Sequence, residues 1–366
     1  MKNTFGNALS VTIFGESHGA AIGAVIDGLA PGLAVDEGFI RHQLSLRRPA
    51  GRISTARREA DEFQILSGVY EGRTTGSPLC IVIPNADTKS GDYQTEIARP
   101  GHADYTAECK YHGYQDARGG GHFSGRVTAA LVAAGAILIP ALKGKGITIG
   151  THVARCAGVN DAPFAFDESE LKAQLLDLNE IPFAVLDASA GEQMRAAIDA
   201  ARTEGDSVGG VLETAIVGLP AGIGEPWFDS IEGLLSHALF SIPAVKGVEF
   251  GDGFALADQK GSEANDAFVV EDGLVSTKTN HNGGINGGIA NGMPVVFRCA
   301  IKPTPTIAKL QETIDVKKKT NVEYGGRGRH DPCIVHRARV VVDSVAALVV
   351  ADLLTQRYGT EGWCQE

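Results

Sequence analysis

The chain has 366 residues, of which 43% are hydrophobic and 21% charged, a balance typical of a globular protein with a substantial core. Its net charge of −11 argues against the broad basic surface of a nucleic-acid-binding protein. The six cysteines are scattered without a CxxC pair, which argues against a zinc ribbon or a disulfide framework and favours a reducing compartment. We therefore expect a cytoplasmic protein with no metal site.

Neither end of the chain predicts a membrane association. The N-terminus lacks the basic and then apolar segments of a secretion signal. The longest apolar stretch, Val340 to Leu354, is interrupted by Asp343 and Asp352. This stretch therefore predicts a buried helix and not a membrane span.

The first half of the chain begins with short apolar runs bounded by Gly or Pro, which are typical of strands. These runs cover residues 9–14, 22–26, 63–66 and 79–83. A helix is expected from Asp36, as its N-cap, to about Leu46. The Ala-rich run Arg126–Leu138 predicts a central buried helix.

The second half alternates helix-like and strand-like segments in no fixed order. Helices are expected at 168–178, 191–203, 227–240 and 340–357, and strands at 211–217, 295–300 and 313–317. Because no strict βαβ rhythm appears, the pattern favours an α+β fold over a doubly wound sheet. Segment 160–204 has the most surface-like composition and could be an insertion, but we interpret residues 1–366 as a single domain.

Several loops carry groups that bind anions. Six arginines lie between Arg41 and Arg58, with no lysine and no acid among them. Arginine forks bind carboxylates and phosphates through two hydrogen bonds, although a solvated charged loop explains the cluster equally well. Ser124 and Arg126 follow the triple glycine 119–121 at the start of the Ala-rich helix, where free N–H groups suit a phosphate. The glycine run itself has one residue too many for a dinucleotide-binding GxGxxG motif.

Other loops hold imidazoles and carboxylates between chain breakers. Segment 15–19 presents Ser17 and His18 directly after a strand, although a lone histidine of this kind is more often part of a surface turn. Segment 99–106 places His102 among an acid, a tyrosine and an arginine, as in an active site. Further polar loops follow at 280–288, which is rich in Gly, and at 302–306 and 328–333, which contain Pro. Five such loops in one chain favour a catalytic site.

Taken together, these segments resemble the signatures of the chorismate synthase family. The matching strings are GESHG (15–19), RRP (47–49), RPGHADYT (99–106), SIPAVKGVEFGDGF (241–254), NHNGG (280–284), KPTPT (302–306) and GRHDPC (328–333). They occur in the family's order and cover nearly the whole chain. The resemblance implies an α+β sandwich with a helical layer between antiparallel β-sheets, assembled as a homotetramer.

The resemblance also implies a reaction. Members of the family convert 5-enolpyruvylshikimate 3-phosphate to chorismate by a 1,4-anti elimination of phosphate, and they require reduced FMN without net redox change. A substrate with one phosphate and two carboxylates needs several cations. The matched substrate-binding positions are Arg47, Arg48, Arg52, Arg99, Arg126 and Arg329.

Catalytic and flavin-binding roles carry over in the same way. His18 would protonate the departing phosphate, and His102 would protonate the reduced flavin. Ser17 and Asp331 would form a proton relay near flavin N5. The matched FMN contacts are His122, Phe123, Ser124, Pro243, Ala244, Gly287, Lys302, Pro303, Thr304, Pro305, Thr306 and Arg329.

Some features leave alternatives open. Many relatives have Arg-Ser where this chain has His122-Phe123, and the loop between Pro49 and Arg52 is one residue shorter than in some of them. No reductase domain, which would use NADPH, is recognisable, so we expect an external flavin reductant. The alternatives are a flavin oxidoreductase with net hydride transfer and an anion-binding module without catalysis.

Overall fold

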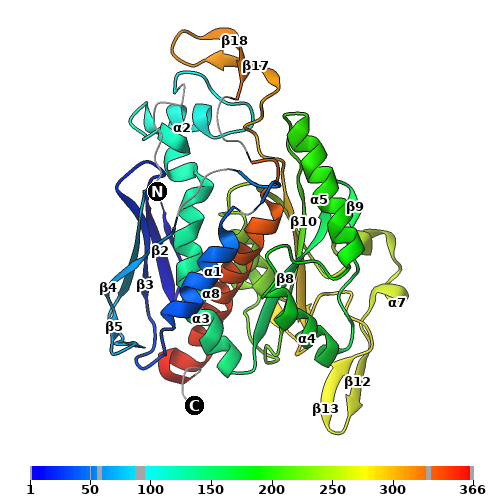
Figure 1. Ribbon diagram of the computed structural model, residues 1–366. Helices are drawn as coiled ribbons and strands as arrows, with labels where there is room; N and C mark the ends of the chain where they lie inside the picture. Colours follow the sequence, from blue (N-terminus) through cyan, green and yellow to red (C-terminus); the bar gives the residue numbers. More distant parts are fainter. Residues whose placement is uncertain (1, 50, 56–59, 87–94, 327–330, 363–366) are drawn as a thin grey trace.

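Two antiparallel β-sheets enclose a layer of helices in this computed structural model, which describes residues 2–49, 51–55, 60–86, 95–326 and 331–362 (Figure 1). The first sheet has the order β1 (Thr4–Phe5), β2 (Ser10–Gly15), β3 (Ala21–Asp27), β7 (Leu79–Pro84) and β4 (Gln64–Ser67). The second has the order β11 (Val245–Phe250), β16 (Val295–Ile301), β10 (Gly210–Val217), β8 (Thr148–Cys156) and β9 (Val159–Asn160). The predicted α+β sandwich is confirmed.

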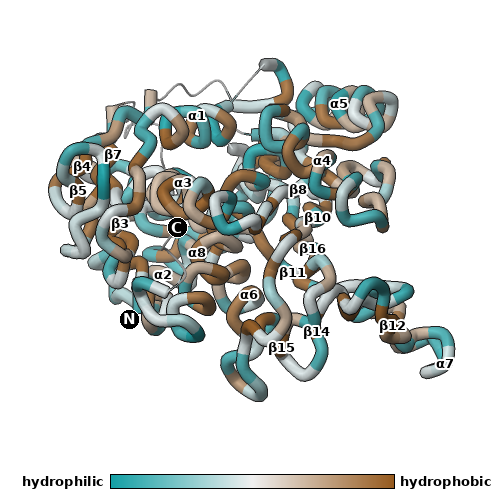
Figure 2. Tube along the Cα trace, turned by 90° about the horizontal axis from the view of Figure 1, so that it is seen from below, coloured by the Kyte–Doolittle hydropathy of each residue, from teal (hydrophilic) through white to brown (hydrophobic). Residues whose placement is uncertain are grey.

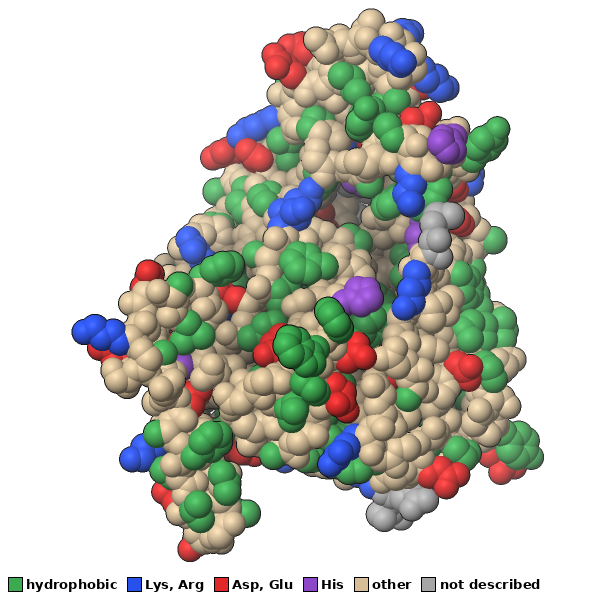
Figure 3. All heavy atoms as spheres, turned by 180° about the vertical axis from the view of Figure 1, so that it is seen from behind, with side chains coloured by type: hydrophobic (Ala, Val, Ile, Leu, Met, Phe, Trp, Pro, Cys, Tyr) green, Lys and Arg blue, Asp and Glu red, His purple; other side chains and the backbone are tan. Residues whose placement is uncertain are grey.

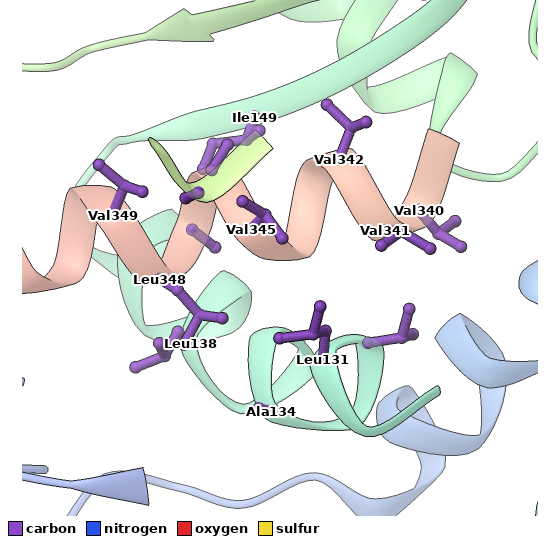
Figure 4. Close-up of a cluster of buried hydrophobic side chains, with 14 of the residues drawn as sticks. Leu131, Ala134, Leu138, Ile149, Val340, Val341, Val342, Val345, Leu348 and Val349 are labelled. Carbon is purple, nitrogen blue, oxygen red and sulfur yellow. The ribbon is translucent and has the colours of Figure 1, made fainter. Parts of the chain in front are cut away.

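The helical layer consists of α1 (Glu37–Arg47), α3 (Thr128–Gly144) and α8 (Val335–Gly362). Figure 2 shows these helices between the two sheets. Helices α3 and α8 approach so closely that a Cβ on Gly135 would lie 2.4 Å from the Cβ of Ser344. Small residues in α3 permit this contact, and larger ones beside it, such as Leu131 and Leu138, pack with Val345 and Leu348 of α8 (Figure 4).

Segment 160–204 forms part of the packing and is not an appended insertion. It contains α4 (Glu168–Leu178) and α5 (Ala188–Thr203). On α4, Leu171 and Leu175 are buried against Ala215 and Val217 of β10. Helix α4 therefore covers the face of the second sheet away from the helical layer, whereas Phe183 of the same segment stacks on His336 of α8. The polar composition of the segment reflects the outward faces of its two helices.

The remaining described elements are short helices and hairpins. The helices are α2 (Asp104–Tyr111), α6 (Ile231–Leu239) and α7 (Gly261–Ala264), with 3-10 turns η2 (Arg118–Phe123), η3 (Gly125–Val127), η4 (Trp227–Asp229) and η5 (Gly253–Asp258). The hairpins are β5 (Val69–Tyr70) with β6 (Arg73–Thr74), β12 (Phe268–Glu271) with β13 (Leu274–Thr277), β14 (Ile285–Asn286) with β15 (Ile289–Ala290), and β17 (Leu310–Asp315) with β18 (Thr320–Gly325).

One helical segment, residues 125–144, is long and apolar enough to span a membrane by length and composition alone. Its most apolar window is 67% buried inside the protein. Core helices pass the same test, so this segment is weak evidence for a membrane span, and its burial is explained by the contacts of α3 with α8 and β3.

Candidate active site

A cavity of about 780 Å³ opens beside the N-terminal end of α3 and contains most of the predicted site residues. Among the described residues that line it, seven carry Lys or Arg side chains and two carry carboxylates. Figure 3 shows a hollow in one face of the molecule with basic and histidine side chains around it. Such an excess of cations, in a chain whose net charge is −11, indicates a site for an anion with several charges.

Three arginines of the cavity meet at one carboxylate, that of Asp61. Arg126 donates a hydrogen bond through Nη1 to Asp61, whose side chain is only 1% exposed. Arg47 Nη1 lies 3.5 Å and Arg48 Nε 3.8 Å from the Asp61 Oδ2 atom. Because a buried carboxylate is costly without a cation, this arrangement balances part of the arginines' charge inside the protein.

The two adjacent arginines of the RRP string differ in their surroundings. Arg47 is buried and donates to the Thr128 hydroxyl at 3.1 Å and to the Gly125 carbonyl at 3.0 Å. Arg48 has a side chain that is 34% exposed and lines the cavity. Arg47 thus fastens the end of α1 to the start of α3, whereas Arg48 faces the cavity.

The triple glycine packs against both predicted catalytic histidines. Gly119, Gly120 and Gly121 all have positive φ angles, 60°, 87° and 53°. A Cβ on Gly119 would lie 2.0 Å from His18 Nδ1, and one on Gly120 would lie 3.3 Å from His102 Nε2. Only glycine at position 119 leaves room for the His18 ring, so the run brings the two imidazoles to one wall of the cavity.

His102 is oriented by its neighbours in the RPGHADYT string. Its Nδ1 lies 2.7 Å from Asp104 Oδ1, and Arg99 Nε donates to Asp104 Oδ2 at 2.8 Å. Burial alone would raise the pKa of Asp104, but the hydrogen bonds from Arg99 and His102 outweigh it and hold that pKa well below its usual value. An ionised Asp104 fixes the orientation of the His102 ring. The bonds of His102 to described residues use Nδ1, so Nε2 is available to a ligand.

Ser17 and Asp331 occupy buried positions near this wall. The Ser17 backbone donates to the Gly121 carbonyl at 3.0 Å, and no described group hydrogen-bonds the buried Ser17 hydroxyl. Asp331 accepts from Nη1 of Arg337, whose Nε donates to the Arg47 carbonyl at 2.9 Å. Arg337 therefore connects Asp331 to the end of α1, where Arg47 lies.

Most of the predicted flavin contacts line the same cavity. These are His122, Phe123, Ser124, Pro243, Ala244, Lys302, Thr304, Pro305 and Thr306. The Lys302 backbone donates to the Ala244 carbonyl at 2.9 Å, which brings two of the predicted segments together. His122 Nδ1 lies 2.7 Å from the Gly15 carbonyl and holds the turn that carries Ser17 and His18.

Four predicted residues are not among those that line the cavity. Ser17 is fully buried, Arg52 is exposed, Pro303 lies between two lining residues, and Gly287 is exposed in the turn between β14 and β15. Arg329 lies outside the described residues, as do Arg57 and Arg58 of the arginine cluster. The roles predicted for all of these residues remain predictions.

Two residues of the site, Asp61 and Arg337, were missed by the sequence analysis, and Asp104 was noted only as an acid near His102 without a role of its own. Asp104 has a local signal, since it follows His102 by two residues within a string already identified. Asp61 lies 13 residues after Arg48, and Arg337 lies 6 residues after Asp331, both outside the identified strings. Only the fold shows that they meet Arg48 and Asp331.

Comparison with known proteins agrees with this geometry. The family model described as chorismate synthase matches residues 9–355. The chain belongs to the chorismate synthase family. A chorismate synthase from Aeropyrum pernix is 46% identical over 97% of this chain and 93% of its own. One from Thermococcus kodakarensis is 45% identical over 98% of this chain and 99% of its own.

A solved structure titled "Crystal Structure of Chorismate Synthase" supports the same assignment. It superposes with a TM-score of 0.78 at 30% identity, covering 98% of this chain and 96% of that one. The protein is accordingly a lyase with chorismate synthase function in the shikimate pathway.

Proposed function

We propose that the protein eliminates phosphate from 5-enolpyruvylshikimate 3-phosphate by a 1,4-anti elimination, with reduced FMN bound in the same cavity. The observation that carries the proposal is the excess of seven basic side chains over two carboxylates around the cavity. One phosphate and two carboxylates on the substrate would use that excess. Arg48, Arg99 and Arg126 are the candidate clamps among the residues that line the cavity, and we retain Arg47, Arg52 and Arg329 as further candidates.

His18 is the proposed acid for the leaving phosphate. It lines the cavity and is held against Gly119, near the start of α3. A protonated imidazole would neutralise charge that develops on the phosphate oxygen as the C–O bond breaks. Arg126, which also lines the cavity near the start of α3, would hold the released phosphate.

His102 is the proposed proton donor on the flavin side of the cavity. Asp104 orients its ring through Nδ1 and leaves Nε2 for the ligand. Ser17 and Asp331 are the proposed relay for the proton lost from the substrate. The buried Ser17 hydroxyl, without a described hydrogen-bond partner, supports this role, since such a group is costly unless a ligand or water completes it.

The residues present fit a flavin mononucleotide. Lys302, Thr304, Thr306 and Ser124 offer a cation and three hydroxyls for its phosphate, and the buried Thr304 hydroxyl has no described hydrogen-bond partner. Phe123 and other apolar lining residues suit a flavin ring. When bound, reduced FMN supplies electron density to the substrate during the elimination. Pro243, Ala244 and His122 complete the proposed contacts, with Gly287, Pro303 and Arg329 as further candidates.

The number of product molecules formed per reduced flavin distinguishes this function from that of a net oxidoreductase. Under strict anaerobiosis, with chemically reduced FMN and the enolpyruvyl ester, we expect product far in excess of the flavin, which stays reduced at the end. One product per reduced flavin, with oxidised FMN left behind, would support hydride transfer instead. Flavin and substrate binding without any turnover would support an anion-binding module.

We also propose a cytoplasmic homotetramer that folds as one domain and depends on an external flavin reductant. One buried apolar cluster that extends from Leu9 to Leu354 supports the single domain. Trp227, Phe228 and Phe254 are each more than 80% exposed in the single chain, which supports burial in an assembly. Light scattering on the purified protein would give the number of subunits. The absence of flavin reduction by NADPH alone would support the external reductant.

A further inference from the structure

The carboxylate of Asp61 lies in the middle of a site built for anions, where a negative charge opposes substrate binding. Its side chain is 1% exposed and is approached by Arg47, Arg48 and Arg126. A residue placed there for stability alone would be expected away from the cavity, yet Asp61 lines it. Its place therefore requires a functional explanation.

The backbone at Asp61 points to the same conclusion. Its φ is +52°, a conformation that costs free energy for residues other than glycine and is best tolerated by Asn and Asp. The strain is maintained where the side chain has to reach one particular point. At Asp61 that point is the centre of three guanidinium groups.

We propose that Asp61 is a positioning residue, a resident counter-ion that holds Arg48 and Arg126 in the geometry that receives the substrate. Three guanidinium groups this close repel one another, and a fixed carboxylate draws them to one place before the substrate arrives. Arg47, whose other described donors bind Thr128, Gly125 and Arg126, ties this arrangement to α1 and α3. In this division of roles Arg47 and Asp61 form the frame and Arg48 faces the ligand. Arg126 lines the cavity as well, but its guanidinium is also held by hydrogen bonds to Asn85 and to the Pro84 carbonyl.

The substitution Asp61→Asn tests the charge of this side chain separately from its shape. Asp61→Asn keeps the size of the side chain and suits the positive φ, but it removes the counter-charge. Without the carboxylate charge, the arginine cluster is more positive, which favours the binding of a simple anion. The arginines are also no longer held in one arrangement, which disfavours the reaction of the substrate. We expect kcat for the enolpyruvyl ester to fall at least tenfold. Inorganic phosphate, the leaving group of the proposed reaction, should bind at least threefold more tightly than to the wild-type protein.

The probe is inorganic phosphate, measured by calorimetry on the flavin-free protein without substrate. Thermal melting with and without phosphate is the second measurement, and the anion should raise the melting temperature of Asp61→Asn more than that of the wild type. Glu62→Gln is the matched control, since it removes an exposed carboxylate one residue away and should change none of these quantities.

The substrate part of this inference rests on the proposed function, but phosphate binding does not. If the wild type showed no turnover and the phosphate affinity still rose in Asp61→Asn, the proposed function would fail and the counter-ion role would stand. Unchanged kcat in Asp61→Asn would overturn the positioning role. A merely structural role would lower kcat and the melting temperature of Asp61→Asn while phosphate binding stays the same or weakens. That result would also overturn the positioning role.

Discussion

Two buried charged clusters in this protein are built on opposite principles. At the cavity, Arg47, Arg48 and Arg126 share the single carboxylate of Asp61. In the second sheet, His152 lies between two carboxylates, with Nδ1 2.7 Å from Asp161 and Nε2 3.0 Å from Glu213. The first cluster has more cations than acids, whereas the second uses both nitrogens of its imidazole internally.

This difference separates a site from a structural support. Asp161 also accepts backbone N–H groups from Leu186 and Asp187 at 2.7 and 2.8 Å, so the His152 cluster fastens the segment before α5 to the sheet. No ligand is needed to complete it. At the cavity, the excess of positive charge among the lining residues is left for a bound anion to balance in the proposed function. An excess of one charge, more than residue type, marks the functional region.

The largest effect should come from the imidazoles of the cavity. We expect His18→Ala and His102→Ala each to lower kcat by about 10²–10⁴-fold, the usual contribution of a general acid, while the protein stays folded. Steady-state kinetics on variants checked by circular dichroism would measure this. His112→Asn, an exposed histidine with φ +57° that Asn tolerates, is the control and should keep full activity. Near wild-type turnover in either alanine variant would remove that residue from the mechanism.

The cavity residues were predictable to the extent that their signals are local. Ser17, His18 and His102 lie in short strings between chain breakers, and the structure brings His18 and His102 to one wall. Asp61 could not be identified, because a carboxylate 13 residues after Arg48 gains its role only when the chain folds back. The sequence likewise does not distinguish Arg47 from Arg48, which differ only in what surrounds them.

The fold shows the same limit. Runs with clear periodicity, such as 168–178, became the expected helix, α4, with the same bounds. The N-cap at Asp36 was confirmed, since its side chain accepts from the Phe39 backbone at 3.0 Å. Strand β8 was not predicted, because both of its faces are buried and its residues lack an alternating pattern. The helix expected at 227–240 is interrupted at Ser230, which caps α6 after the turn η4.

The next largest effect tests the division between the two arginines of the cavity. We expect Arg48→Ala to weaken substrate binding by about 2–5 kcal/mol, because one anionic group of the substrate loses its fork. Substrate affinity, measured by calorimetry with oxidised FMN present, checks this. Arg41→Ala on the exposed side of α1 removes the same charge and should do little. Equal and small effects from both would favour a solvated arginine loop.

Arg47→Ala should act on stability instead. It removes a buried cation from Asp61 together with the link to Thr128 and Gly125. We expect a loss of about 3–5 kcal/mol in the free energy of unfolding, as when one partner of a buried ion pair is removed. Urea denaturation would measure it. A stable Arg47→Ala protein with weakened substrate binding would reverse the division of roles.

A smaller, pH-dependent effect is expected from the second cluster. Burial disfavours the charged imidazole, but hydrogen bonds to Asp161 and Glu213 outweigh it and raise the pKa of His152 above its usual 6.5. The stabilisation from the charged His152 and its two carboxylates is therefore fully present below pH 6.5 and is lost as the pH rises through the raised pKa of His152. His152→Gln should cost about 2 kcal/mol at pH 6 and less at pH 9. Denaturation at both pH values tests this, and kcat of the folded protein should not change.

The smallest effect concerns the position where many relatives carry arginine. His122 Nδ1 donates to the Gly15 carbonyl, so a proton gained at Nε2 would give the cavity one more positive charge beside the proposed flavin site. Because a protonated imidazole at this position would attract the flavin phosphate, we expect FMN to bind a few-fold more tightly at pH 6 than at pH 8. His122→Gln keeps a donor and an acceptor without this charge, and its FMN affinity should be flat over the same range. Fluorescence titration at several pH values makes the comparison, and identical profiles for the two proteins would show that His122 acts in the cavity only as the neutral support of the Gly15 turn. In that event it would resemble His152, whose nitrogens bind partners within the protein, more than the cationic residues around it.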